Sequence, residues 1–418
     1  MEIYHGNIVY SKSKDDLAEY KDGYVVVQNG VVEGVYQELP DEFVGANTTE
    51  LERDEVLIPA FSDLHVHAPQ YPNRGLQTDE LLSDWLSLHT FPLEAKYKGL
   101  DFAKAVYDEF VDDMILHGTM HASVFGTLHK EATGYLIERM EKKGLRAYVG
   151  KVNMDMNSPA YLCESVEDSL KDTEEYLEKY SENKYAKPIL TPRFAPTCSR
   201  ELLFGLGRLG KKYGVGVQTH VVESKWEAQE AKRLFADCSC DTEIYEKAGL
   251  LGNGATIAAH FMYPSNDDVR ILREYGGVAV QCPDATISII AGIMPTARLQ
   301  KEGVKVAIGT DISAGHCLGV YSQVGRAVQL SKIKGLYEPE NSGAISFARA
   351  FYMATKEGGA VFGNVGSLER GYTFDALVIG GVQKTFENLT PSEIVERFCY
   401  LGETKHIRAR YLNGEKIG

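Results

Sequence analysis

Residues 56–67 read VLIPAFSDLHVH, an apolar run that ends in His65 and His67. Side chains two residues apart point to the same face of a strand, so both imidazoles can meet one ion. Three later runs also end in a histidine or an aspartate: VGVQTH (215–220), ATIAAH (255–260) and VKVAIGTD (304–311). Because the carboxyl ends of parallel strands meet at one face, this recurrence predicts that the runs deliver their last side chains to a common site.

Around these runs the sequence alternates between strand-like and helix-like segments. From about Leu57 to about Gly371, eight apolar β-type runs are separated by charged stretches such as residues 100–118, LDFAKAVYDEFVDDMILHG. Eight alternations over about 300 residues are typical of a closed parallel barrel. We therefore predict an α/β protein built on a (β/α)8 TIM barrel, with an open doubly wound sheet as the alternative.

The two ends of the chain have a different pattern. Residues 24–36 read YVVVQNGVVEGVY, in which Asn29-Gly30 separates two β-branched runs and indicates a hairpin. After Gly371 the chain returns to β-type runs. We expect residues 1–57 and 371–418 to form one small β-sandwich domain beside a metal-dependent barrel of residues 58–370.

The composition is that of a globular protein with a sizeable core. Of 418 residues, 44% are hydrophobic and 25% are charged, and the formal net charge is -15. Such a charge disfavours polyanionic partners, so we expect neither nucleic acid nor a membrane as a partner. The seven cysteines are scattered, and the start of the chain does not resemble a secretory signal. These features predict a cytoplasmic protein with reduced thiols.

The strand-end residues have the chemistry of a catalytic metal centre. We assign a divalent ion to three neutral imidazoles and one carboxylate, which leave room for a water molecule; these ligands are His65, His67, His220 and Asp311. Such an ion lowers the pKa of bound water toward neutrality and creates a nucleophile. The pattern therefore predicts a mononuclear metal hydrolase. Core histidines would be the alternative, but they would not explain why the strand ends recur.

Two more residues are candidates for the chemistry itself. Glu223 lies three residues after His220, from where its carboxyl group can serve the bound water or the substrate as a general acid and base. His260 ends another apolar run and can stabilise the attacking hydroxide or a developing oxyanion. A role for His260 as a further metal ligand is the alternative.

Longer stretches around these residues resemble the amidohydrolase superfamily and, within it, the guanine deaminases. The stretches are PAFSDLHVHAPQYPNRGL (59–76), LSDWLSLHTFPLEAKY (82–97), TPRFAPTCS (191–199), QTHVVESKWE (218–227), AAHFMY (258–263) and GTDISAGH (309–316). The resemblance covers nearly the whole chain. It implies a homodimer with one Zn²⁺ per subunit that deaminates guanine to xanthine and ammonia. The same ligand set also accepts Fe²⁺.

The resemblance also implies which side chains contact the purine. They are His67, Gln70, Arg193, Phe194, His220, Glu223 and Asp311. The chemistry agrees, because O6 and N7 of guanine are acceptors that the guanidinium fork of Arg193 can meet with two hydrogen bonds. The ring of Phe194 can pack on the purine face.

The expected mechanism uses Glu223, His260 and Asp311 as catalytic groups. A metal-bound hydroxide attacks C2 of guanine, Asp311 accepts the proton of the water, and Glu223 protonates ring N3. The metal and His260 stabilise the tetrahedral intermediate, and Glu223 then helps to protonate the leaving ammonia.

Other functions stay open at this stage. Another aminohydrolase on the same barrel would act on cytosine, an adenosine-like compound or a triazine. A two-metal amide hydrolase is disfavoured because Arg193 stands where such enzymes carry a bridging lysine. The stretch QCPDATIS (281–288) departs from the HCPxSN pattern of the resembling family, so the effect of Asp284 on specificity is also open.

Overall fold

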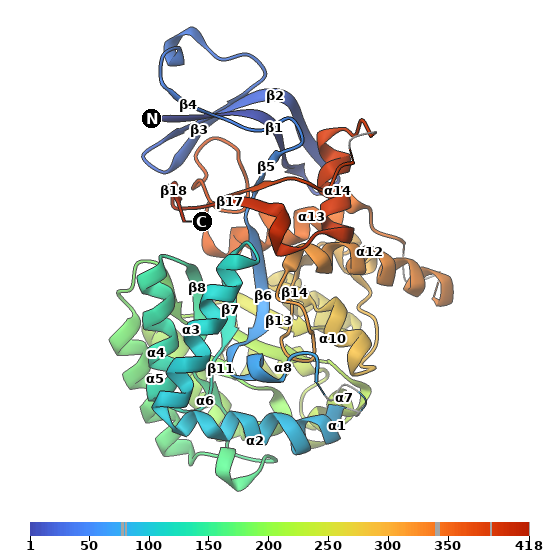
Figure 1. Cartoon of the computed structure of the whole chain (residues 1–418). Coiled ribbons are helices and arrows are strands. Elements are labelled where there is room, and N and C mark those ends of the chain that lie inside the picture. Colours follow the sequence, from blue (N-terminus) through green and yellow to red (C-terminus); the bar gives the residue numbers. More distant parts are fainter. Residues whose placement is uncertain (77–78, 80–81, 339–342, 385–386, 418) are drawn as a thin grey trace.

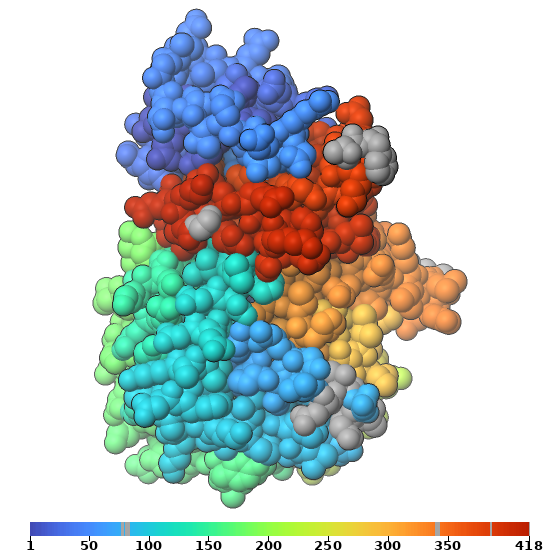
Figure 2. All heavy atoms as spheres, in the orientation of Figure 1, coloured from blue at the N-terminus to red at the C-terminus, as the bar shows by residue number. Residues whose placement is uncertain are grey.

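The computed structural model describes residues 1–76, 79, 82–338, 343–384 and 387–417. It is a mixed α/β protein in which strands from both ends of the chain gather at one end of the molecule (Figure 1). Parallel strands surrounded by helices form the rest (Figure 1). Figure 2 shows the C-terminal residues lying between the N-terminal strands and the remainder of the chain.

The sheet at the chain ends has eight strands in the order β18-β17-β16-β5-β1-β2-β3, with β4 paired to β1. Its N-terminal strands are β1 (Glu2–Ser13), β2 (Asp16–Gln28), β3 (Val31–Tyr36), β4 (Asn47–Glu50) and β5 (Val56–Pro59). Its C-terminal strands are β16 (Ala376–Ile379), β17 (Ile407–Leu412) and β18 (Glu415–Lys416). Because β5 pairs with both β1 and β16, the two ends of the chain share one sheet.

The hairpin predicted from residues 24–36 is confirmed. Strands β2 and β3 are antiparallel, and the residues between them are Asn29 and Gly30. Both have positive φ, 52° for Asn29 and 76° for Gly30. A two-residue turn between twisted strands needs this left-handed backbone, which asparagine and glycine adopt at low cost.

The parallel strands form two sheets of four and one of two. The first sheet contains β6 (Phe61–His67), β7 (Thr119–Phe125), β8 (Arg146–Gly150) and β10 (Ala186–Pro188). The second contains β12 (Val217–Val221), β13 (Thr256–His260), β14 (Val278–Gln281) and β15 (Lys305–Ile308). The short pair is β9 (Val152–Asn153) with β11 (Thr191–Pro192). All residues of β6, β7, β12 and β13 are buried, which explains why these strands read as apolar runs.

Backbone hydrogen bonds link the two four-stranded sheets on both sides. Between β10 and β12, Leu190 donates to Gly216 and Gln218 donates to Leu190. Between β15 and β6, Asp311 donates to the carbonyl of His65 over 2.8 Å. The last residues of β6 and the residues just after β15 are therefore held side by side.

The helices lie around the parallel strands, and the last two also contact the sheet formed by the chain ends. The helices are α1 (Leu82–Trp85), α2 (Phe91–Glu94), α3 (Leu100–Leu116), α4 (Lys130–Lys143), α5 (Val166–Tyr180), α6 (Arg200–Tyr213), α7 (Lys225–Leu234), α8 (Asp241–Lys247), α9 (Asn266–Glu274), α10 (Pro283–Ser288), α11 (Thr296–Lys301), α12 (Val320–Tyr337), α13 (Phe347–Tyr352) and α14 (Pro391–Leu401). Helices α1, α2 and α7 lie at the end far from the N-terminal strands (Figure 1). Within the described ranges, no helix combines the length and apolarity needed to span a bilayer.

Candidate active site

Five predicted side chains meet at the carboxyl ends of the parallel strands. His65 and His67 belong to β6, His220 to β12 and His260 to β13, and Asp311 follows β15. All five are buried. Because these strands run in the same direction, residues from four of them converge although as many as 246 positions separate them in the sequence (311 minus 65).

The distances between the side-chain atoms suit a divalent ion. His67 Nε2 lies 3.2 Å from His220 Nε2, and Asp311 Oδ1 lies 3.3 Å from His65 Nε2 and 3.5 Å from His67 Nε2. Ligands about 2.0–2.2 Å from a tetrahedral zinc ion are separated from one another by about 3.3–3.6 Å. Both ring nitrogens of His65 are buried and have no hydrogen-bond partner among the described residues. The donor set therefore fits a metal ion.

The protonation states of His67 and His220 also suit metal binding. His220 Nδ1 lies 2.6 Å from the carbonyl oxygen of Arg193, which can only accept, so Nδ1 carries the proton and Nε2 keeps its lone pair. Burial and the neighbouring imidazoles hold the pKa of both His67 and His220 well below its usual range. Both rings are therefore neutral, as a metal ligand must be.

His260 and Glu223 stand beside this cluster. His260 Nε2 lies 3.6 Å from Glu223 Oε1 and 3.8 Å from Asp311 Oδ2. Burial, with a smaller contribution from the Asp311 charge, raises the pKa of Glu223 to about 8, so this carboxyl group holds its proton at neutral pH. Burial lowers the pKa of His260 to about 3. His260 also lies within ligand distance of His65 and His220, so the geometry permits its role as a further ligand.

The strand ends that carry the site have an unusual backbone. Val222, His260, Phe261 and Asp311 all have φ between 45° and 70°, a left-handed conformation that non-glycine residues rarely adopt. For the β-branched Val222 this conformation is especially unfavourable. Such strain persists only where surrounding contacts hold it, and it is concentrated at functional sites.

A cavity of about 670 Å³ opens over the cluster. All seven residues expected to contact a purine line this cavity. Apolar side chains complete the wall, namely Trp85, Leu86, Phe91, Trp226, Ile289 and Ile290. Aromatic rings with a few convergent polar groups are typical of a site for a flat heterocycle.

Glu94, at the end of α2, is a site residue that sequence reasoning missed. It is 4% exposed, and its two oxygens accept hydrogen bonds from two cavity residues. Oε1 accepts from Gln70 Nε2 over 3.0 Å, and Oε2 accepts from Arg193 Nη1 over 2.8 Å. Glu94 lies within the quoted stretch LSDWLSLHTFPLEAKY, but nothing in local spacing signals contacts with residues 24 and 99 positions away.

Two further buried carboxyl groups, Glu227 and Asp241, were also missed. Glu227 Oε2 accepts from the backbone N–H of Glu223 over 2.8 Å, and Asp241 Oδ2 accepts from that of Val222 over 3.0 Å. The two acids therefore hold consecutive residues of the strained turn that carries Glu223. In the sequence, Glu227 looks like an ordinary acidic residue in the first turn of α7. Only the folded structure shows that it binds the backbone N–H of Glu223.

Asp284, in the stretch that departs from the resembling family, is directed toward α12. Its carboxylate accepts from Gln323 Nε2 over 2.7 Å and pairs with Arg326 Nε over 2.5 Å. Asp284 is not among the described residues that line the cavity. The adjoining Ile289 and Ile290 do line it, so this segment contributes apolar surface to the cavity.

Comparison with known proteins places the chain in a family. Residues 56–413 match the model of the amidohydrolase family. The chain is 34% identical to a guanine deaminase of Dictyostelium discoideum over 87% of this chain and 83% of that protein. It is 32% identical to a guanine deaminase of Homo sapiens over 88% of this chain and 84% of that protein.

Solved structures give the same result. A crystal structure of guanine deaminase from C. acetobutylicum, with guanine bound in its active site, superposes with a TM-score of 0.96 and 41% identity and covers both chains completely. An adenosine deaminase from Xanthomonas campestris with bound zinc shares the fold, with a TM-score of 0.84 and 21% identity over 99% of this chain and 92% of that chain. The chain belongs to the amidohydrolase family.

Proposed function

We propose that this protein is a guanine deaminase, which hydrolyses guanine to xanthine and ammonia. The observation that carries the proposal is a single cavity that joins a metal-ligand cluster to Arg193, Gln70 and Phe194, groups suited to the edge and face of a purine. A relative that is 41% identical over the whole chain holds guanine in its active site.

We also propose a domain organisation for the chain. Residues 58–370 form a (β/α)8 TIM barrel, and residues 1–57 with 371–418 form a small β-sandwich domain. Hydrogen bonds that link the two four-stranded parallel sheets on both sides support a closed barrel. The shared eight-stranded sheet supports one domain built from both chain ends. A cytoplasmic homodimer without nucleic-acid or membrane partners completes the proposal.

One Zn²⁺ per subunit is assigned to four ligands, His65, His67, His220 and Asp311. When bound, the ion supplies a Lewis acid that lowers the pKa of a water molecule toward neutrality. Iron would use the same ligands. The orphaned ring nitrogens of His65 and the 3.2–3.5 Å separations of the ligand atoms support this assignment.

The cavity residues bind and orient the purine. Arg193 uses one guanidinium nitrogen for Glu94, which leaves its other donors for the O6 and N7 acceptors of guanine. The guanidinium group also lies over the ring of Phe91, 5.3 Å from its centroid. Phe194 lies between His220 and Trp226, with ring centroids 6.5 and 6.4 Å away, and can pack on the purine and exclude water.

Glu223 and Asp311 move the protons of the reaction. Glu223 donates its proton to N3 while the oxygen of water bonds to C2, and Asp311 takes the first proton that the water loses. The C2–N2 bond then breaks as the amine is protonated. Glu223 then takes the second proton of the water from the new hydroxyl group on C2 and passes it to the amine, and Asp311 returns the first proton to Glu223. N3 thus gains the original proton of Glu223, ammonia leaves with one proton of the water, and both carboxyl groups end as they began. His260, neutral and facing Glu223 and Asp311, donates a hydrogen bond to the oxygen that develops negative charge.

Ammonia release tests the proposal. The purified zinc-loaded protein is incubated with guanine, adenine, cytosine and their nucleosides. We expect release from guanine alone, loss of release after chelation, and recovery when zinc is restored. Release from cytosine or an adenosine-like compound in place of guanine would assign the chain to another aminohydrolase of the same family.

A further inference from the structure

A buried ion pair lies at the part of the cavity wall that Arg193 and Gln70 form. The side chains of Arg193 and Glu94 are each 5% exposed, and Arg193 Nη1 lies 2.8 Å from Glu94 Oε2. Arg193 lines the cavity, whereas Glu94 is buried and is not among the described residues that line it. The carboxylate that balances the positive charge of Arg193 is therefore not part of the cavity wall.

Glu94 also orients the second polar group of this wall. A carboxylate can only accept, so the Gln70 atom 3.0 Å from Glu94 Oε1 is its NH2 group. The Gln70 carbonyl oxygen then accepts from the backbone N–H of Ser313 over 3.3 Å. Glu94 therefore fixes both which way the Gln70 amide faces and where the Arg193 guanidinium lies.

The charge of Glu94 has a consequence for which ligands bind. In a buried site with low effective dielectric, an unbalanced guanidinium attracts anions strongly. Guanine is neutral at physiological pH. Its deamination product carries a second carbonyl group in place of the amine, is more acidic, and is partly an anion at the same pH. A carboxylate behind Arg193 opposes the binding of that anion and leaves the hydrogen bonds to a neutral base intact.

We propose that Glu94 is a positioning and selectivity residue, which balances the charge of Arg193 so that the cavity favours neutral guanine over anionic oxopurines, including its own product. This inference rests on the proposed function. Release of the product is thereby assisted, because the ring that leaves is a poorer ligand than the ring that entered.

The test replaces Glu94 by glutamine and measures binding of three ring ligands. Urate is an anion at neutral pH, hypoxanthine is neutral, and xanthine lies between them. Dissociation constants are measured by calorimetry on the zinc-loaded protein, together with kcat and KM for guanine. For Glu94→Gln we expect binding of urate relative to hypoxanthine to strengthen at least about tenfold, since removing a unit charge several ångströms away acts at an effective dielectric near 20. The KM for guanine should rise more than kcat falls, because glutamine can accept from only one of its two former donors.

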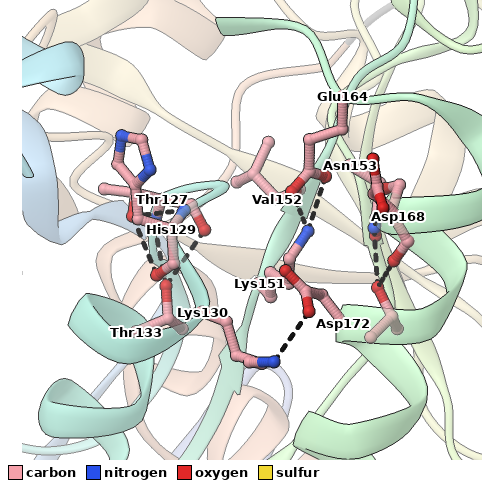
Figure 3. Close-up of polar contacts among 12 residues, drawn as sticks. Thr127, His129, Lys130, Thr133, Lys151, Val152, Asn153, Glu164, Asp168 and Asp172 are labelled. Carbon is pink, nitrogen blue, oxygen red and sulfur yellow. Dashed lines mark hydrogen bonds and ion pairs between the residues drawn. The ribbon is translucent and has the colours of Figure 1, made fainter. Parts of the chain in front are cut away.

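A matched control is available in another buried ion pair. Lys151 Nζ lies 2.6 Å from Glu164 Oε2 (Figure 3). The side chain of Lys151 is fully buried. Neither residue lines the cavity among the described residues. Glu164→Gln removes the same charge from a comparable pair, so it should leave the urate-to-hypoxanthine ratio unchanged.

Two more variants separate charge from structure. Glu94→Asp keeps the charge, and its urate-to-hypoxanthine ratio should stay near that of the wild type even where guanine binds less well. Arg193→Gln removes the opposite charge, and the ratio should fall. Equal changes for all three ligands in Glu94→Gln, or the same ratio change in Glu164→Gln, would overturn the inference. Failure of the proposed function itself is distinguishable, because the wild-type protein would then neither release ammonia from guanine nor bind hypoxanthine.

Discussion

At the scale of single residues, burial decides which side chains of the site carry a proton at neutral pH. Glu223, whose pKa burial raises to about 8, keeps its proton at neutral pH, whereas His260 beside it is neutral. The two groups lie 3.6 Å apart without forming an ion pair, since neither is charged. A carboxylic acid that stays protonated beside the neutral imidazoles can donate its proton as soon as a substrate binds.

Replacing Glu223 by glutamine tests this role. The variant preserves the shape of the side chain but cannot give up a proton, so we expect normal zinc content, near-normal binding of hypoxanthine, and a loss of kcat of at least about 10²–10⁴-fold. Steady-state kinetics and metal analysis on the same preparation provide the measurement. Near-normal turnover would remove Glu223 from the proton transfers.

At the scale of elements, the turn between β12 and α7 shows how two acids hold a strained strand end. Val222 has φ of 45°, and its N–H and that of Glu223 are bound by Asp241 and Glu227. Burial and the nearby Asp241 charge raise the pKa of Glu227 well above its usual range, and burial raises that of Asp241 to about 7. Glu227 therefore keeps a proton and can donate it to Asp241.

A pair of substitutions at Glu227 tests this arrangement. Glutamine reproduces the protonated acid, with an oxygen for the Glu223 N–H and an NH2 group for Asp241, so Glu227→Gln should keep kcat within a few-fold. Alanine removes both contacts, so Glu227→Ala should lower kcat about 100-fold through misplacement of Glu223, with stability reduced by about 1–3 kcal/mol. Kinetics and denaturant titration measure both effects. Equal losses in the two variants would contradict a shared proton.

At the scale of the whole molecule, a buried polar chain joins the parallel strands to the C-terminal segment. Ser62 Oγ lies 3.0 Å from His121 Nδ1, and His121 Nε2 lies 3.0 Å from Asp375 Oδ2. The carboxylate must accept, so Nε2 carries the proton and Nδ1 accepts from Ser62. These are the residue types of a hydrolytic triad, but all three are fully buried and none lines the cavity among the described residues. These residues link the parallel strands to the C-terminal segment.

Removal of the carboxylate should loosen this junction. Asp375→Ala leaves His121 without an acceptor in a fully buried position, and we expect a loss of about 3 kcal/mol in the free energy of unfolding. Asp267→Ala, which breaks an exposed pair with Arg270, is the control and should cost less than about 0.5 kcal/mol. Denaturant titration compares the two variants. The guanine kinetics of the folded Asp375→Ala protein should stay within a few-fold of the wild type, because the site lies at the other end of the strands.

Local sequence pattern was sufficient for those features that depend on neighbours along the chain. The hairpin at Asn29-Gly30 follows from backbone preferences of two residues, and the buried strands follow from apolar runs. The shared position of His65, His67, His220 and Asp311 followed because each one ends such a run, and parallel strands end at a common face. The resemblance added the residues proposed to contact a purine, and all of them line one cavity in the structure.

The remainder was decided by tertiary structure, because it depends on how distant elements pack against one another. Glu94 meets Arg193 across 99 positions, and His121 meets Asp375 across 254. No local sequence pattern shows which of the 59 acidic residues will be buried next to a particular hydrogen-bond donor. The sequence alone thus predicted the proposed ligands, the strands that carry them and the class of chemistry. Only the folded chain determined the protonation of Glu223, the orientation of Gln70 and the charge balance of Arg193, since burial and long-range contacts set all three.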